Sequence, residues 1–147
     1  MASKNDWWTC PTESEDGRLV MVTGRRDIAK FKENKRFSIR VEITWIYDES
    51  PEAGMPDLAT SELMEQATDN LAKIFDADPV AVMTGIYTGA GERNWVFYTL
   101  STHIFQRELN EALAELPLLP LQISAENDAD WEEYAEMRSL SEIQAED

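Results

Sequence analysis

The chain has 147 residues, of which 29 are acidic and 13 are basic, giving a formal net charge of −16 at pH 7. This negative charge repels polyphosphate backbones and anionic lipids, so it argues against a general nucleic-acid or membrane binder. The hydrophobic fraction of 43% is sufficient for a packed core. We expect one domain over residues 1–147, with an ordered core at about 7–140 and a frayed tail at 141–147.

Cysteine and histidine are too scarce for several kinds of site. Cys10 is the only cysteine and His103 the only histidine, which excludes an intramolecular disulfide and any metal centre built from several of these residues. The N-terminal residues lack the apolar core of a signal peptide, and no run of about 18 apolar residues occurs. We therefore expect a soluble, cytoplasmic protein.

The first half of the chain predicts two strands and a helix. Residues 18–24 form a short apolar run typical of a strand, and residues 37–47 alternate between apolar and polar side chains, as a half-buried strand does. Two prolines and a glycine in residues 48–56 predict a connection. Apolar residues at helical spacing then predict a helix that begins at about Asp57 or Ser61 and ends at Phe75.

Residues 80–87 and 93–100 are rich in β-favouring side chains and are separated by Gly89 and Gly91. The two glycines could belong to a dinucleotide-binding loop, but that motif needs a third glycine, where Asn94 stands, and a helix after it. We therefore predict a β-hairpin whose glycines supply positive φ angles.

The last part of the chain predicts a helix, a strand and a second helix. Ser101 or Thr102 caps the first helix, which Pro117 ends. Residues 119–124 form a short strand, and Pro120 favours an edge position because it cannot donate a hydrogen bond. A final helix opens at Asn127 or Asp128. The side chains that could dock it on the core are Trp131, Tyr134 and Met137.

This order of elements is typical of an α+β protein. We predict a two-layer sandwich with a ferredoxin-like βαββαβ core, an added N-terminal strand and a C-terminal helix. The position of the added strand in the sheet stays open, because the first strand of such a core is central and leaves little room beside it.

Two surfaces are candidates for partner binding. Residues 25–36 carry a local balance of +4, and the polar face of the strand 37–47 would be either wet or covered by a partner. The alternative for the basic stretch is a solvated connection between strands. The candidate partner-binding residues are Arg25, Arg26, Lys30, Lys32, Arg40 and Glu42.

No catalytic, cofactor-binding or metal-binding residues are predicted. The acidic string at 128–133 imitates the start of a calcium loop, but Glu133 stands where that loop requires glycine. A row of carboxylates along the helix at 57–75 could serve acid–base chemistry, although a solvated helix face explains it more simply. These residues are Glu62, Glu65 and Asp69.

Several short motifs resemble a known family. They are Trp8 with Asp16-Gly17, the G-M-P loop at 54–56 before an L-M-E-containing helix, the hairpin T-G-x-G-x-R-x-W-x-F-Y, and the closing D-x-x-W-x-x-Y. Together they are similar to the bacterial domain-of-unknown-function family numbered 695. The resemblance implies no catalytic residues. It also implies a relation to the regulator of ribonuclease E activity B family, whose small acidic ferredoxin-like members inhibit a nuclease by binding it.

These observations favour a binding or regulatory module that acts by protein contact, with an acidic surface directed toward a basic partner. The net charge and the absence of a catalytic motif carry this hypothesis. The alternative is an enzyme with a carboxylate-based site that the sequence does not disclose. Nucleic-acid binding through residues 25–36 is the least favoured interpretation.

Overall fold

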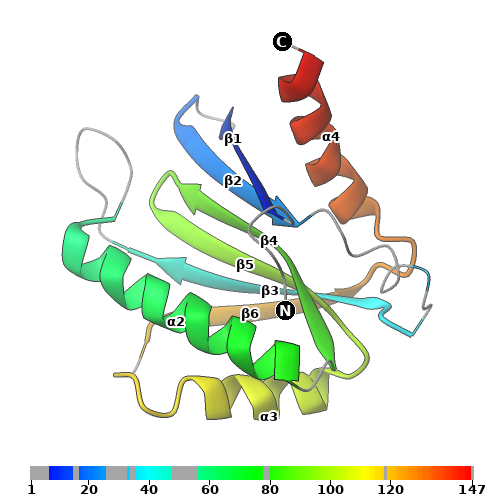
Figure 1. Cartoon of the computed structure of the whole chain (residues 1–147). Coiled ribbons are helices and arrows are strands. Elements are labelled where there is room, and N and C mark those ends of the chain that lie inside the picture. The colour runs from blue at the N-terminus through cyan, green and yellow to red at the C-terminus, as the bar shows by residue number, and fades with distance from the viewer. Residues whose placement is uncertain are drawn as a thin grey trace.

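The computed structural model describes residues 7–14, 17–25, 33, 36–47, 56–77, 80–117 and 119–146. These residues form an α+β fold, with a six-stranded antiparallel sheet and three helices (Figure 1). The strands are β1 (Trp7–Glu13), β2 (Leu19–Arg25), β3 (Ile39–Ile46), β4 (Ala81–Gly89), β5 (Glu92–Thr99) and β6 (Leu121–Asn127). The helices are α2 (Leu58–Ala77), α3 (Thr102–Ala112) and α4 (Glu132–Glu146).

The strands lie in the order β1-β2-β4-β5-β3-β6, and every neighbouring pair is antiparallel. The β1–β2 hairpin therefore extends the sheet beyond β4, which settles where the N-terminal strand lies. The edge position expected for the strand after Pro120 is confirmed. The sequence patterns do not predict β1, whose Pro11 argues against a strand although an edge position tolerates it.

The first hydrophobic core lies between the sheet and the helices α2 and α3 (Figure 1). Phe75, Phe97 and Phe105 form its centre, with ring centroids 5.0 to 5.2 Å apart. Trp95 is also buried here, and its indole nitrogen donates a hydrogen bond of 2.8 Å to Thr68 Oγ1. The alternation predicted for residues 37–47 is confirmed from Ile39 onward, since Val41, Ile43 and Trp45 lie in this core. Phe37 departs from the prediction, because it precedes β3 and is buried in the core on the other face of the sheet.

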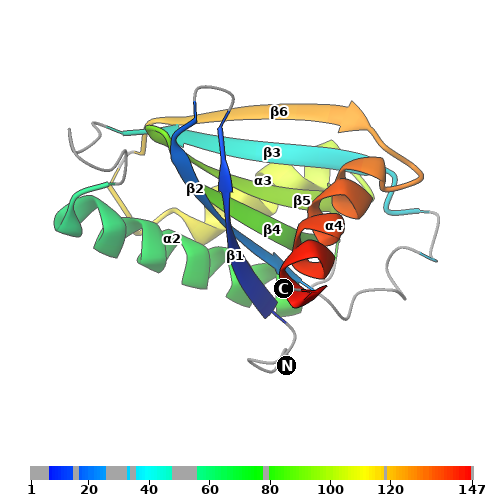
Figure 2. The ribbon, with the colours of Figure 1, turned by 90° about the horizontal axis from the view of Figure 1, so that it is seen from above.

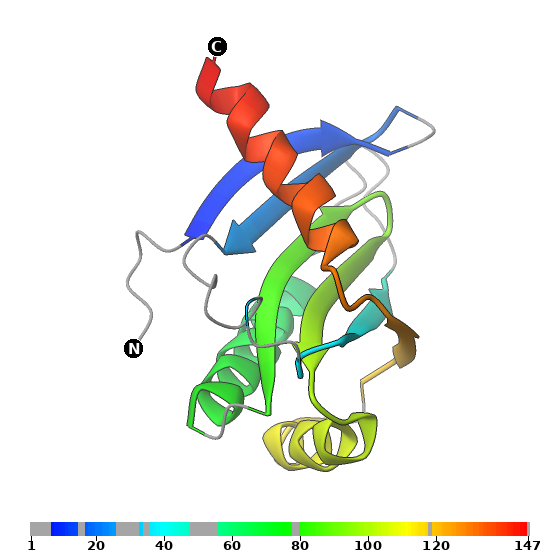
Figure 3. The same ribbon diagram turned by 90° about the vertical axis from the view of Figure 1, so that its right-hand side faces the viewer.

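A second hydrophobic core lies on the opposite face of the sheet, under α4 (Figures 2 and 3). The two-layer arrangement expected from the sequence is therefore incomplete, because α4 adds a third layer over β1, β2 and β4. Gly85 permits this close approach, since a Cβ atom there would lie 2.4 Å from Met137 Sδ. The buried residues of this core are Trp8, Cys10, Val22, Phe37, Val82, Tyr98, Trp131, Tyr134 and Met137.

The helix ends follow the expected capping residues. Asp57 Oδ1 accepts a hydrogen bond of 2.8 Å from the Thr60 amide, and Ser101 Oγ accepts one of 3.3 Å from the Ile104 amide. Helix α4 continues to Glu146, beyond Leu140, where the sequence predicts fraying. No helix of the described ranges has the length and apolar character needed to cross a bilayer.

Candidate functional site

Helix α4 covers only part of its face of the sheet, and a hollow of about 380 Å³ lies beside it. We name it the Arg40 hollow. Its lining residues are Thr12, Glu13, Ser14, Val20, Arg40, Glu42, Tyr87, Gly89, Ala90, Glu92, Asn94 and Glu133. They come from β1 to β5, their connections and the first turn of α4, so the hollow depends on how α4 is docked. Its volume lies at the lower end of the range for small-molecule sites.

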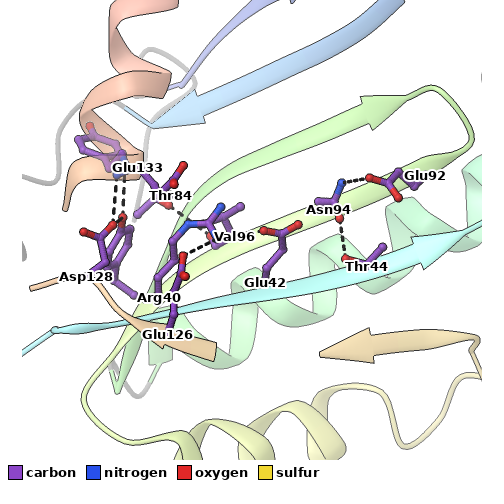
Figure 4. A network of polar contacts seen from close by, with 12 residues as sticks. Arg40, Glu42, Thr44, Thr84, Glu92, Asn94, Val96, Glu126, Asp128 and Glu133 are labelled. Atoms are coloured by element: carbon purple, nitrogen blue, oxygen red, sulfur yellow. Dashed lines mark hydrogen bonds and ion pairs between the residues drawn. The ribbon is translucent and has the colours of Figure 1, made fainter. Parts of the chain in front are cut away.

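Strand alternation places the polar side chains of β3 and β5 in this hollow. Because Val41 and Ile43 point into the first core, the side chains of Arg40, Glu42 and Thr44 must point to the opposite face. Asn94 of β5 lies beside them, and its Oδ1 accepts a hydrogen bond of 2.6 Å from Thr44 Oγ1 (Figure 4). The polar face of this strand, predicted to be wet or covered, is thus partly enclosed by the chain itself.

Arg40 is the cation at the centre of this polar network (Figure 4). Its Nη1 donates to Glu42 Oε2 at 3.0 Å and lies 3.7 Å from Glu126 Oε1, and its side chain is only 13% exposed. Burial acts to lower the pKa of Arg40, but Glu42 and the charge of Glu133 outweigh this effect and raise it. Its Nε is buried and has no hydrogen-bond partner within the described residues.

Glu133 reaches the hollow because the start of α4 is firmly anchored. Asp128 Oδ1 accepts a hydrogen bond of 2.9 Å from the Glu132 amide, and Asp128 Oδ2 accepts one of 3.1 Å from the Glu133 amide (Figure 4). Tyr98 Oη also donates to Asp128 Oδ2, at 2.6 Å. Burial raises the pKa of Asp128, but these three donors outweigh it and lower the pKa below its ordinary value.

Aromatic contacts complete the anchoring of α4. The rings of Tyr98 and Trp131 stack with centroids 4.2 Å apart, and Trp131 Nε1 donates a hydrogen bond of 2.8 Å to the Phe37 carbonyl. Tyr134 Oη donates a hydrogen bond of 2.6 Å to the Arg25 carbonyl at the end of β2. The docking role expected for Trp131, Tyr134 and Met137 is thus confirmed.

Tyr87 supplies a neutral hydrogen-bonding group to the hollow. Burial raises the pKa of its phenol to about 12, while Arg40 acts in the opposite direction. The phenol therefore stays protonated at neutral pH and cannot serve as a general base there. The sequence gives no sign of this role, because a Tyr in an apolar strand is more often part of the core.

The tip of the β4–β5 hairpin borders the hollow. Gly89, Ala90 and Gly91 all have positive φ angles, of 149°, 54° and 87°. A Cβ atom at Gly89 would lie 2.3 Å from the Leu19 carbonyl oxygen, so glycine is required by close packing as well as by its backbone angle. The predicted hairpin is confirmed, and the strand after Gly91 replaces the helix that a dinucleotide loop requires.

The structure describes three of the six candidate partner-binding residues. Arg40 and Glu42 meet in the Arg40 hollow, whereas Arg25 lies at the end of β2, with its guanidinium 5.6 Å from the centroid of the Trp7 ring. Arg26, Lys30 and Lys32 lie outside the described residues. Of the carboxylates in the hollow, the sequence singles out only Glu42 for binding.

A second hollow, of about 440 Å³, lies on the α2 side of the sheet. Its cation is Arg93, whose Nε donates a hydrogen bond of 2.8 Å to Thr88 Oγ1 and whose Nη1 lies 3.6 Å from Glu65 Oε1. The guanidinium also lies 5.8 Å from the centroid of the Trp95 ring. This arginine is held by its own neighbours, so the hollow offers less unpaired charge than the Arg40 hollow does.

The comparisons with known proteins place most of the chain in one family. The model described as a family of unknown function, DUF695, matches residues 6–137. No curated protein and no solved structure matches the chain. The matched range contains every residue that lines the Arg40 hollow.

Proposed function

The chain belongs to the family of unknown function DUF695, and we propose that it is a binding or regulatory module that recognises a partner with a basic surface through the Arg40 hollow. The observation that carries this proposal is the charge of the lining. Four carboxylates, from Glu13, Glu42, Glu92 and Glu133, line the hollow together with the one guanidinium of Arg40, which leaves a formal balance of −3 for the lining.

The carboxylates of the hollow differ in how far they are neutralised. Glu42 is paired with Arg40 at 3.0 Å, and Glu92 Oε1 accepts a hydrogen bond of 3.1 Å from Asn94 Nδ2. Glu13 and Glu133 have no ion-pair partner within the described residues. A lysine or arginine of a partner would therefore gain charge-assisted hydrogen bonds that the chain itself does not satisfy.

The site is also pre-organised. Its floor is a hydrogen-bonded sheet, and the Asp128 cap and the stacked Trp131 hold Glu133 in place. Binding to a rigid surface loses less conformational entropy than binding to a mobile loop. Glu42 is half-buried, so its charge is screened less than the charges of the exposed Glu13, Glu92 and Glu133.

Charge-matched variants test the proposal. Glu13→Gln with Glu133→Gln removes two charges from the hollow, and Glu62→Gln with Asp69→Asn removes two charges from the exposed face of α2. We expect the first pair to weaken binding of a short arginine-rich peptide roughly tenfold, which corresponds to about 1.4 kcal/mol. The second pair should change the affinity less than about twofold.

Isothermal titration calorimetry at low and at physiological salt would measure both effects. A glutamate-rich peptide of equal length serves as the negative control. If the two double variants lose affinity equally, the binding depends on net charge alone and the Arg40 hollow is not the site.

We propose further that β3, α2, β4, β5, α3 and β6 form a ferredoxin-like unit, with β1, β2 and α4 added to it. The support is the spatial order β4-β5-β3-β6, in which β5 separates the two strands joined by α2. In this arrangement the Arg40 hollow lies on the sheet face opposite α2 and α3. An experimental structure with a different strand order would contradict it.

A further inference from the structure

The two edges of the sheet are built differently. The outer strand β1 contains Pro11, which has no N–H group, so it cannot offer a complete row of donors. The outer strand β6 (LQISAEN) contains neither proline nor lysine, the residues that commonly block an edge strand. Figure 2 shows β6 along one side of the sheet, and within the described residues no strand pairs with its outer side.

The pairing with β3 determines which groups of β6 point outward. The Asp128 amide donates to the Ser38 carbonyl at 2.8 Å, and the register pairs Arg40 with Glu126 and Glu42 with Ser124. Because bonded and non-bonded positions alternate in an antiparallel ladder, the even-numbered residues of β6 bond to β3. The N–H and C=O groups of Ile123 and Ala125 therefore point away from the sheet.

The helix-side surface of β6 is apolar and hollowed. Ile123 is 49% exposed, so its apolar side chain is available for a contact at this edge. A groove of about 260 Å³ lies between β6 and α3, and Ile123 and Ala125 form part of its lining. Phe105 and Val41 form part of its lining, so the groove leads to the first core.

We propose that β6 pairs with β6 of a second copy of this chain, in antiparallel orientation, with the two-fold axis at Ser124. All seven residues of the strand then have a partner. Ile123 lies opposite Ala125 of the copy, so that each isoleucine enters the groove of the other molecule. The outward N–H and C=O groups of Ile123 and Ala125 bond to each other across the axis.

The residues of β6 are self-complementary in this register, which favours a second copy as the occupant. On the opposite face, Glu126 lies beside Gln122 of the copy, and the amide can donate to the carboxylate. An axis at Glu126 would instead place two carboxylates directly opposite each other. The net charge of −16 on each copy opposes association, so the dimer should strengthen as salt is added.

A cysteine at the axis tests the register. Ser124 would form a non-hydrogen-bonded pair with its copy, with Cα atoms about 4.5 Å apart, a distance that permits a disulfide. We expect Ser124→Cys to form a covalent dimer under mild oxidation. Gln122→Cys is the matched control, because its two copies would lie about 13 Å apart along the strands. Cys10 is buried, and its pKa is raised by burial, so it should not interfere.

Sedimentation velocity over a range of protein and salt concentrations tests the dimer itself. Ala125→Pro removes an outward N–H without removing a bond to β3, and it should weaken dimerisation roughly tenfold or more, because the bond is lost from both copies. Ala125→Ser keeps the amide and should dimerise normally. Should Ala125→Pro fail to fold, Ile123→Lys places a charge in the groove and should have the same effect.

The outcomes separate this proposal from its alternatives. A monomer at every salt and protein concentration would overturn it, as would equal cross-linking through positions 122 and 124. If an added strand-forming peptide binds the edge while the purified chain stays monomeric, the edge serves another protein and the second copy is wrong. These results are independent of peptide binding in the Arg40 hollow.

Discussion

The two faces of the sheet are built by the same strands but are covered differently. On one face, α2 and α3 close a dry core of aromatic and aliphatic side chains (Figure 1). On the other face, α4 covers only part of the sheet (Figure 3). The polar Arg40 hollow lies beside it. Strand alternation thus decides which side chains share a face, whereas the helices decide which part of that face stays open.

Some polar side chains of the open part bond to one another. Thr44 bonds to Asn94 of the neighbouring strand, and Arg40 bonds to Glu42 two residues further along its own strand. Such bonds satisfy part of the polar groups that lie beside a hydrophobic core, whereas the buried Nε of Arg40 has no partner within the described residues. We therefore expect substitutions in the two regions to differ in kind: those in the dry core should reduce stability, and those in the hollow should reduce binding.

The largest loss of stability is expected for Phe97→Ala. Phe97 is fully buried between Phe75 and Phe105, and deleting its ring leaves a cavity that should cost about 4 kcal/mol. The control is Asn94→Ala on the same strand, which loses lateral hydrogen bonds and should cost less than about 1.5 kcal/mol. Urea denaturation would measure both, and equal losses would contradict the distinction between the faces.

A somewhat smaller and more local effect is expected for Trp131→Ala. This substitution removes the ring stacked on Tyr98 and the hydrogen bond to Phe37, at a cost of about 3 kcal/mol. Because the described side chains of α4 pack in the second core, on the face opposite α3, amide hydrogen exchange should accelerate in α4 and leave α3 protected. Uniform acceleration in both helices would mean that the two cores do not open separately.

The smallest effect is expected for Asp128→Asn. An asparagine can still cap α4, but it loses the charge that three donors stabilise, so we expect a cost of about 1 kcal/mol at neutral pH. The folded-state pKa of Asp128 is lowered, so this contribution is complete well above its ordinary pKa of 3.8 and is lost as the pH falls through the folded value. Denaturation at pH 7 and pH 3 should show the difference between the two proteins shrinking at the lower pH.

Local patterns in the sequence predict most of the fold. The alternation of residues 37–47 gives β3 and its buried face, and the glycines between 80–87 and 93–100 give the hairpin. These signals involve neighbours along the chain, and simple steric rules decide them. The membership of DUF695 that the short motifs indicate is also confirmed.

The site depends on contacts between distant segments, which no local pattern reveals. In the sequence, Glu133 is recognisable only as a charged residue in the first turn of a helix. In the structure it lines the hollow because Trp131 docks α4 on the face opposite α2. Glu13 belongs to β1, which the sequence does not predict because Pro11 argues against a strand. Only Arg40 and Glu42 could be selected in advance, since both lie on the polar face of a strand whose other face is predicted to be buried.

The most direct test of the central claim is to map a basic ligand onto the chain by NMR. Addition of a short arginine-rich peptide to the labelled protein should shift the backbone amide signals of Glu42, Tyr87, Asn94 and Glu133, which surround the Arg40 hollow. The signals of Glu62 and Asp69 on the exposed face of α2 should stay unchanged. Shifts that follow every exposed carboxylate equally would contradict a role for the hollow as the recognition site.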